Sequence, residues 1–133
     1  MTDYFKVIMD DEDLRKISNL GLAHLGDAVY ELMVRTWLCA HGGSTSKNLH
    51  KAAVTYVSAP AQAKAVLKLE PHLTENEKTV LKRGRNAHVN SVPSKSTIGE
   101  YHAATGIEAL FGYLYLKGQT DRLNELFNII MEQ

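Results

Sequence analysis

The sequence of residues 20–40 is LGLAHLGDAVYELMVRTWLCA. Apolar residues recur with helical spacing on two opposite faces of this stretch, which predicts a helix that packs on both sides. A helix of this kind lies at the centre of a domain rather than on its surface. Asp27 is the one acid on the face that also holds Ala23, Tyr30 and Val34. We therefore expect a central helix that carries a carboxylate within an apolar face.

A second helix of the same character is predicted at 98–117, where Glu108 interrupts an otherwise apolar face. Burying a carboxylate without a partner costs several kcal/mol or forces the group to take up a proton. Asp27 and Glu108 therefore need a salt bridge to a buried Lys or Arg, a divalent cation such as Mg²⁺, or a cleft that water fills. Helical spacing leaves these three explanations open. Glu31, one turn after Asp27, either stays at the rim of such a site or pairs with Arg35.

Helix signals recur along the whole chain, whereas period-two alternation and hairpin dipeptides are scarce. Two capping boxes are predicted, one at Thr74–Glu77 and one at Thr97–Glu100. Gly118 is expected to end a helix, and either Thr120 or Asp121 is expected to cap the last one. The sequence thus predicts an all-α fold. Helices are expected near 11–18, 20–40, 46–56, 59–69, 75–86, 98–117 and 120–132, with Gly42-Gly43 ending the second and a polar loop from Asn86 to Ser96.

The chain has 133 residues, of which 44% are hydrophobic, and this fits one domain spanning 1–133. Cys39 is the only cysteine, which excludes an internal disulfide and fits a reducing compartment such as the cytoplasm. We expect no signal peptide, because the N-terminus lacks a basic segment followed by an apolar run. No apolar run is long enough to span a bilayer.

The net charge of zero conceals a segregation of charge along the chain. Residues 32–99 hold ten Lys and Arg against three acids, a balance of +7, and the two flanking segments together hold five against twelve, a balance of −7. Such a basic half indicates a polyanionic partner. The alternative is that solvated helix faces carry the charge without forming a patch in space.

Three stretches together resemble one known family. Residues 25–29, LGDAV, resemble the signature helix of the ribonuclease III family, and residues 107–116, IEALFGYLYL, resemble its second metal-binding helix. Between them, residues 82–87, KRGRNA, are similar to a stretch typical of Mini-III, the short bacterial branch. The resemblance covers roughly residues 19 to 132.

The resemblance implies a helical homodimer that hydrolyses double-stranded RNA with Mg²⁺, for which Mn²⁺ can substitute. Each subunit contributes one catalytic centre, and the products carry 5′-phosphate and 3′-hydroxyl ends. Mini-III enzymes are associated with maturation of the large-subunit (23S) ribosomal RNA precursor in the cytoplasm. They lack the double-stranded-RNA-binding domain of larger relatives, and we expect none here.

By this resemblance, Asp27 and Glu108 are the catalytic metal ligands, and the metal would activate a water for attack on phosphorus. Ala23 and Thr105 stand where larger relatives have further acids. Glu31 and Thr105 are the candidates for supporting the metal site from outside. The uncharged donors and basic residues between Lys78 and Gly99 suit duplex RNA, which is recognised mainly through shape, phosphates and 2′-hydroxyls. The candidate RNA-binding residues are Lys82, Arg83, Arg85, Asn86, His88 and Lys95.

Two rival functions remain at this point. The first is a catalytically silent RNA-binding or ribosome-associated protein of the same fold, and the presence of both Asp27 and Glu108 counts against it. The second is a helical adaptor that binds other proteins. Incubation with duplex RNA, with Mg²⁺ or with EDTA, distinguishes an enzyme from the first rival, and failure to bind duplex RNA at low salt would indicate the second.

Overall fold

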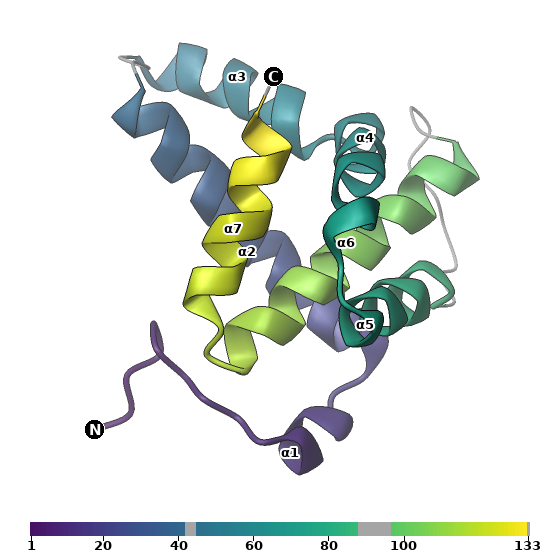
Figure 1. The fold of residues 1–133 in the computed structure, drawn as a ribbon. Helices are drawn as coiled ribbons and strands as arrows, with labels where there is room; N and C mark the ends of the chain where they lie inside the picture. The colour runs from purple at the N-terminus through teal and green to yellow at the C-terminus, as the bar shows by residue number, and fades with distance from the viewer. Residues whose placement is uncertain (42–44, 88–96, 133) are drawn as a thin grey trace.

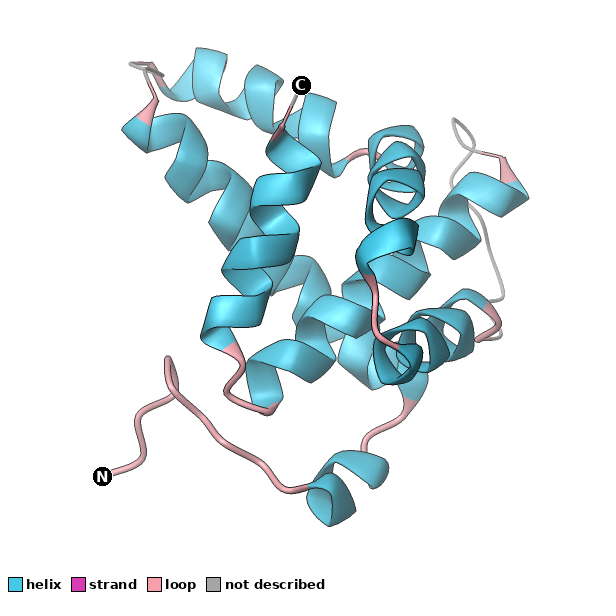
Figure 2. Cartoon of the chain, in the orientation of Figure 1, coloured by secondary structure: helices cyan, strands magenta, loops and turns pink. Residues whose placement is uncertain are grey.

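The computed structural model describes residues 1–41, 45–87 and 97–132. Within these ranges all regular secondary structure is helical and no strand occurs, as Figure 2 shows. The all-α prediction is confirmed. The elements are α1 (Asp11–Arg15), α2 (Asn19–Ala40), α3 (Ser46–Val57), α4 (Ala59–Leu69), the 3₁₀ turn η1 (Glu70–His72), α5 (Glu75–Arg85), α6 (Ile98–Leu116) and α7 (Thr120–Met131).

Every predicted helix is present, with ends that lie within three residues of the predicted ones. The largest difference is at α1, which ends at Arg15 instead of residue 18. The turn η1 was not predicted; it contains Pro71 and links α4 to α5. Gly42-Gly43 and residues 88–96 of the predicted loop lie outside the described residues.

The predicted helix caps are confirmed with one exception. Both capping boxes form: the Glu77 amide donates to Thr74 Oγ1 at 3.2 Å, and Thr97 and Glu100 make the equivalent pair. Gly118 follows α6 with φ of 73°, a conformation that glycine adopts without strain. The predicted cap at Thr120 or Asp121 is wrong, because α7 already begins at Thr120 and its N-cap, Gln119, makes no side-chain capping bond.

The helix α6 forms the centre of the molecule, and α2, α4, α5 and α7 all pack against it. Figure 1 shows α6 running obliquely through the fold and crossing α2 near the middle. Nine of its side chains or glycines are buried, and they point in all directions around the helix axis. The prediction that this helix is buried nearly all round is therefore confirmed.

The helix α2 is buried on one side only. Its buried side carries Tyr30 and Val34, whereas Ala28 and Leu32 are exposed, Leu32 to 56%. The prediction of burial on both faces is wrong for a single chain. The helical spacing of apolar residues identifies an apolar face, but it does not show whether the same chain covers that face.

The two central helices touch through their backbones at two glycines. A Cβ added to Gly26 would lie 1.5 Å from the carbonyl oxygen of Glu108, and one added to Gly112 would lie 2.1 Å from the carbonyl oxygen of Leu22. Real Cβ atoms never come so close to an oxygen, so any larger residue would force the helices apart. Glycine at both positions is therefore a condition for this crossing.

The crossing of α5 with α6 depends on small residues in the same way. A Cβ on Gly84 would lie 2.6 Å from the Cβ of Ala109, and one on Gly106 would lie 2.9 Å from the Leu81 carbonyl oxygen. Consequently α6 carries one close contact with α2 and a second with α5. The two contacts fix the positions of three helices relative to one another.

A buried ion pair ties α7 to the start of α5. Arg122 donates from Nε and Nη2 to the two carboxylate oxygens of Glu77, both at 2.8 Å, and Nη2 also donates to the carbonyl of His72. The Arg122 hydrogen bonds hold the pKa of Glu77 below its usual range. Removing one partner of such a pair typically costs about 3–5 kcal/mol, because the other charge stays buried.

We predict that Gly112→Ala destabilises the fold by about 1–3 kcal/mol or more, because the new methyl group collides with the Leu22 carbonyl. Gly99→Ala is the matched control on the same helix, since no described atom lies within 4 Å of its added Cβ. That control should be neutral or slightly stabilising. Urea unfolding measures both free energies, and equal stability of the two variants would contradict the close crossing.

Candidate active site

The glycine crossing brings two carboxylates together. Asp27 directly follows Gly26 in α2, and Glu108 is the residue of α6 whose backbone Gly26 touches. Asp27 is exposed, so its expected burial within the apolar face of Ala23, Tyr30 and Val34 is wrong. Glu108 is half-buried. The two acids are 81 positions apart in the sequence, yet the close contact of Gly26 with the Glu108 backbone makes them neighbours.

The electrostatics of this pair are unfavourable without a cation. Burial, then the negative charge of Asp27 and a hydrogen bond with its carboxyl group, raise the pKa of Glu108 from 4.5 to about 8. A hydrogen bond from Gln62 acts in the opposite direction. Among the described residues, no Lys or Arg pairs with either acid within 4.0 Å.

The donor set fits a hard divalent cation. Two adjacent carboxylates supply the oxygen ligands that Mg²⁺ prefers, and a double positive charge would remove their mutual repulsion. In the described part of the chain, no group of three His, Cys, Asp or Glu forms around any point. Asp27 and Glu108 could therefore hold a cation that keeps several waters or substrate oxygens in its coordination sphere.

Both supporting candidates make hydrogen bonds with residues other than this pair. Glu31 forms a salt bridge with Arg35 at 2.9 Å, which confirms one of its two predicted alternatives. Thr105 is buried, and its hydroxyl donates to the Tyr101 carbonyl one turn earlier at 3.0 Å. Ala23, the other position that is acidic in larger relatives, is buried and apolar.

Gln62 is the site residue that the sequence analysis missed. Its side chain is 1% exposed, and its Nε2 atom donates to Glu108 Oε2 at 3.4 Å. The sequence did contain a signal: Gln62 shares the buried stripe of α4 with Ala65, Val66 and Leu69. A lone amide in an otherwise apolar stripe requires a buried polar partner.

The structure divides the candidate RNA-binding residues into two groups. Lys82, Arg85 and Asn86 line one groove of about 500 Å³, together with Lys78. Glu70 also lines this groove and pairs with Arg85 at 3.2 Å. His88 and Lys95 lie outside the described residues.

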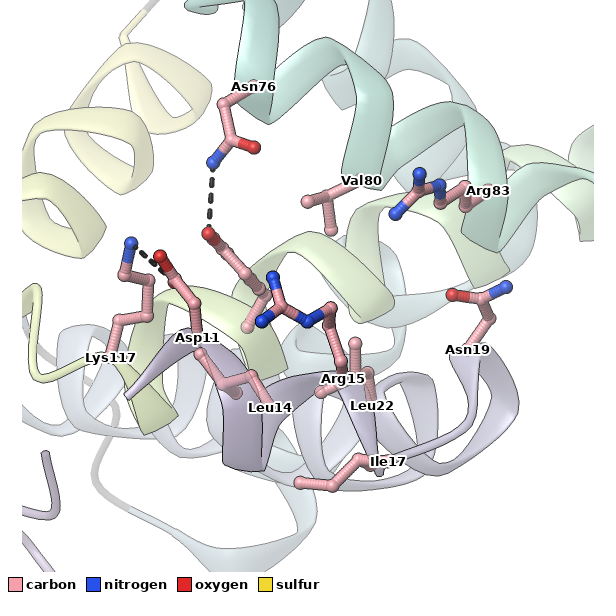
Figure 3. A pocket seen from close by; sticks show the side chains of 11 residues that line it. Asp11, Leu14, Arg15, Ile17, Asn19, Leu22, Asn76, Val80, Arg83 and Lys117 are labelled. Carbon is pink, nitrogen blue, oxygen red and sulfur yellow. Dashed lines mark hydrogen bonds and ion pairs between the residues drawn. The ribbon is translucent and has the colours of Figure 1, made fainter. Parts of the chain in front are cut away.

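Arg83 faces a different hollow, of about 450 Å³, on another side of α5. Figure 3 shows Arg83 there opposite Arg15 of α1, with Asn76 and Lys117 farther along. Asn76 donates to the Tyr113 hydroxyl at 2.9 Å, and Lys117 pairs with Asp11 at 3.2 Å. The lining contains neither Asp27 nor Glu108, so this hollow is separate from the carboxylate pair.

Within the described residues, no helix combines the length and the apolar character that crossing a bilayer requires.

The crowding of the two acids generates a prediction about stability. Because the folded pKa of Glu108 lies above 4.5, the folded chain retains a proton that the unfolded chain releases. Stability without metal therefore falls as the pH rises from 4.5 to about 8. We predict that Glu108→Gln removes this loss and unfolds several degrees higher than the parent at the upper end of that range.

Thermal unfolding in EDTA across this pH range measures the effect. Glu12→Gln is the control, because Glu12 is an exposed acid in α1. If Glu108→Gln and Glu12→Gln both follow the parent curve, burial and the charge of Asp27 do not raise the pKa of Glu108 as inferred.

Comparison with known proteins identifies the family. The model of the ribonuclease III domain matches residues 20–119. The chain is 50% identical over 107 residues to the Mini-ribonuclease 3 of Symbiobacterium thermophilum, covering 80% of this chain and 82% of that protein. It is 48% identical over 122 residues to that of Brevibacillus brevis, covering 89% and 91%. A crystal structure of a Fusobacterium nucleatum protein superposes with a TM-score of 0.83 at 32% identity, covering 91% of this chain and 98% of that one. Both Asp27 and Glu108 lie inside the matched range, and the chain belongs to the ribonuclease III family.

Proposed function

We propose that this chain is an endoribonuclease that cleaves double-stranded RNA with a divalent cation held by Asp27 and Glu108. The observation that carries the proposal is the pair itself: two neighbouring carboxylates at the α2–α6 crossing, one exposed and one half-buried, with no basic partner among the described residues. Membership of the ribonuclease III family supports the same activity.

The residues have different tasks in this proposal. Mg²⁺, or Mn²⁺ in its place, would activate a water and neutralise charge at the phosphorus when bound. The exposed carboxylate of Asp27 faces solvent, where an RNA phosphate arrives, and the half-buried Glu108 is fixed to the central helix. Holding both ligands on packed helices limits the reorganisation that the reaction requires.

The groove beside α5 supplies the proposed RNA contacts. Lys78, Lys82 and Arg85 line it with positive charge, and Asn86 adds an uncharged donor. This combination suits an RNA backbone with its phosphates and 2′-hydroxyls. Binding that depends on such charges weakens steeply as the salt concentration rises. Arg83, His88 and Lys95 remain candidates from the sequence.

We further propose that the enzyme acts as a homodimer through the exposed side of α2. Leu20 and Leu32 are exposed apolar residues there, and Ala28 lies exposed between them. A second copy covering this side would bury the apolar surface, and a two-fold axis would place one carboxylate pair on each RNA strand. The resemblance to Mini-III points to a 23S ribosomal RNA precursor as substrate and the cytoplasm as compartment.

We predict that Asp27→Asn lowers cleavage of duplex RNA by 100-fold or more, because one metal ligand loses its charge. RNA binding should change little, and the unfolding temperature without metal should not fall, since Asp27 is exposed and its charge repels Glu108. Asp121→Asn, an exposed acid at the start of α7, is the control and should cut normally. The assay compares product formation with Mg²⁺ and with EDTA.

An Asp27→Asn protein that still cuts at the parental rate would refute the metal assignment. Intact RNA with the unmodified chain and Mg²⁺, at several salt concentrations, would favour the catalytically silent rival. Both results are read from the same gel.

We predict that Arg85→Ala weakens RNA binding and lowers the slope of log K against log salt by about one, as expected for a lost phosphate contact. Glu70→Gln should tighten RNA binding, because it releases the Arg85 guanidinium from its 3.2 Å ion pair with Glu70. Arg15→Ala, in the separate hollow, is the control. Salt titrations of RNA affinity measure all three, and an unchanged slope for Arg85→Ala would remove it from the RNA surface.

A further inference from the structure

Three polar or charged side chains are buried among the described residues: Gln62, Glu77 and Thr105. Glu77 is explained by its ion pair with Arg122, and Thr105 by its bond to the preceding turn. Gln62 is the third, and its side chain donates a hydrogen bond to Glu108, on a different helix 46 residues away. We therefore attribute the burial of Gln62 to its interaction with the carboxylate pair.

Burying the side-chain amide of Gln62 in this apolar environment is energetically unfavourable. Moving an amide from water into an apolar interior is unfavourable unless the amide is hydrogen-bonded. A side chain such as Met or Leu would fill the same space without that cost. The neighbours of Gln62 on the buried stripe of α4 are apolar, including Ala65 and Val66. Packing alone thus gives no reason for an amide at this position.

An amide does, however, suit the task of orienting a metal-binding carboxylate. It donates an N–H without bringing a positive charge, whereas Lys or Arg would compete with the cation for the same oxygens. Because Gln62 is 1% exposed, packing holds the donor in place. It contacts Oε2 of Glu108 at 3.4 Å, a bond that gains strength when the carboxylate is ionised.

We propose that Gln62 is a positioning residue of the active site, whose amide holds the Glu108 carboxylate in the orientation that binds the divalent cation. The inference rests on the proposed metal-binding role of Asp27 and Glu108. It makes α4 part of the catalytic apparatus although α4 carries no acid. Outer hydrogen-bond partners of this kind commonly change metal affinity 10–100-fold when they are removed.

The test uses Gln62→Met in the full chain. Met has similar length and volume but no donor, so the packing of α4 is kept while the hydrogen bond is lost. Binding of Mn²⁺ alone, followed by electron paramagnetic resonance or calorimetry without RNA, should weaken about 10-fold. At saturating Mn²⁺, kcat should fall while KM for duplex RNA stays unchanged, because Gln62 does not contact RNA.

Leu67→Met is the matched control, since it introduces the same residue on the exposed side of the same helix. It should bind Mn²⁺ and cut RNA as the parent does. Gln62→Leu provides a second donor-free variant should Gln62→Met fail to fold. A folded variant of Gln62 with parental Mn²⁺ affinity and parental kcat would overturn the proposal.

Asp27→Asn separates this failure from failure of the proposed function. Loss of cleavage and of Mn²⁺ binding in Asp27→Asn, with parental behaviour of Gln62→Met, would refute only the role of Gln62. Parental cleavage by Asp27→Asn would refute the carboxylate site itself, and with it the inference drawn from it.

Discussion

The backbone contact between α2 and α6 at Gly26 and Gly112 is the constraint on which the rest of the structure depends. It allows α6 to lie deep enough for four other helices to cover it. The contact also sets the position of Asp27, which follows Gly26 immediately, against Glu108. The same contact therefore determines both the packing of the helices and the relative position of the two acids. A larger residue at either glycine would alter both at once.

Much of this arrangement was predictable because it is local. Helix ends depend on caps such as Thr74 and Thr97, whose partners lie three residues away, and the sequence displays them directly. Asp27 and Glu108 were visible as acids on apolar faces, and the family resemblance joined them. Neither observation required knowledge of the tertiary structure.

The features that escaped prediction depend on partners far apart in the chain. Gln62 meets Glu108, Arg122 meets Glu77, and Arg85 meets Glu70, across 46, 45 and 15 positions. The spacing of apolar residues along a helix gives no information about such pairs. The prediction that α2 is buried on both faces was wrong for a related reason. The sequence of an apolar face is the same whether its own chain or another molecule covers it.

The location of the carboxylate pair also has a consequence for how this enzyme can diverge. Both acids, and the amide beside them, stand on packed helices rather than on the connections between helices. Changes of length or sequence in those connections can therefore occur without moving the proposed metal ligands. The fold thus keeps the proposed site apart from the segments of a protein that most readily accept insertions and substitutions.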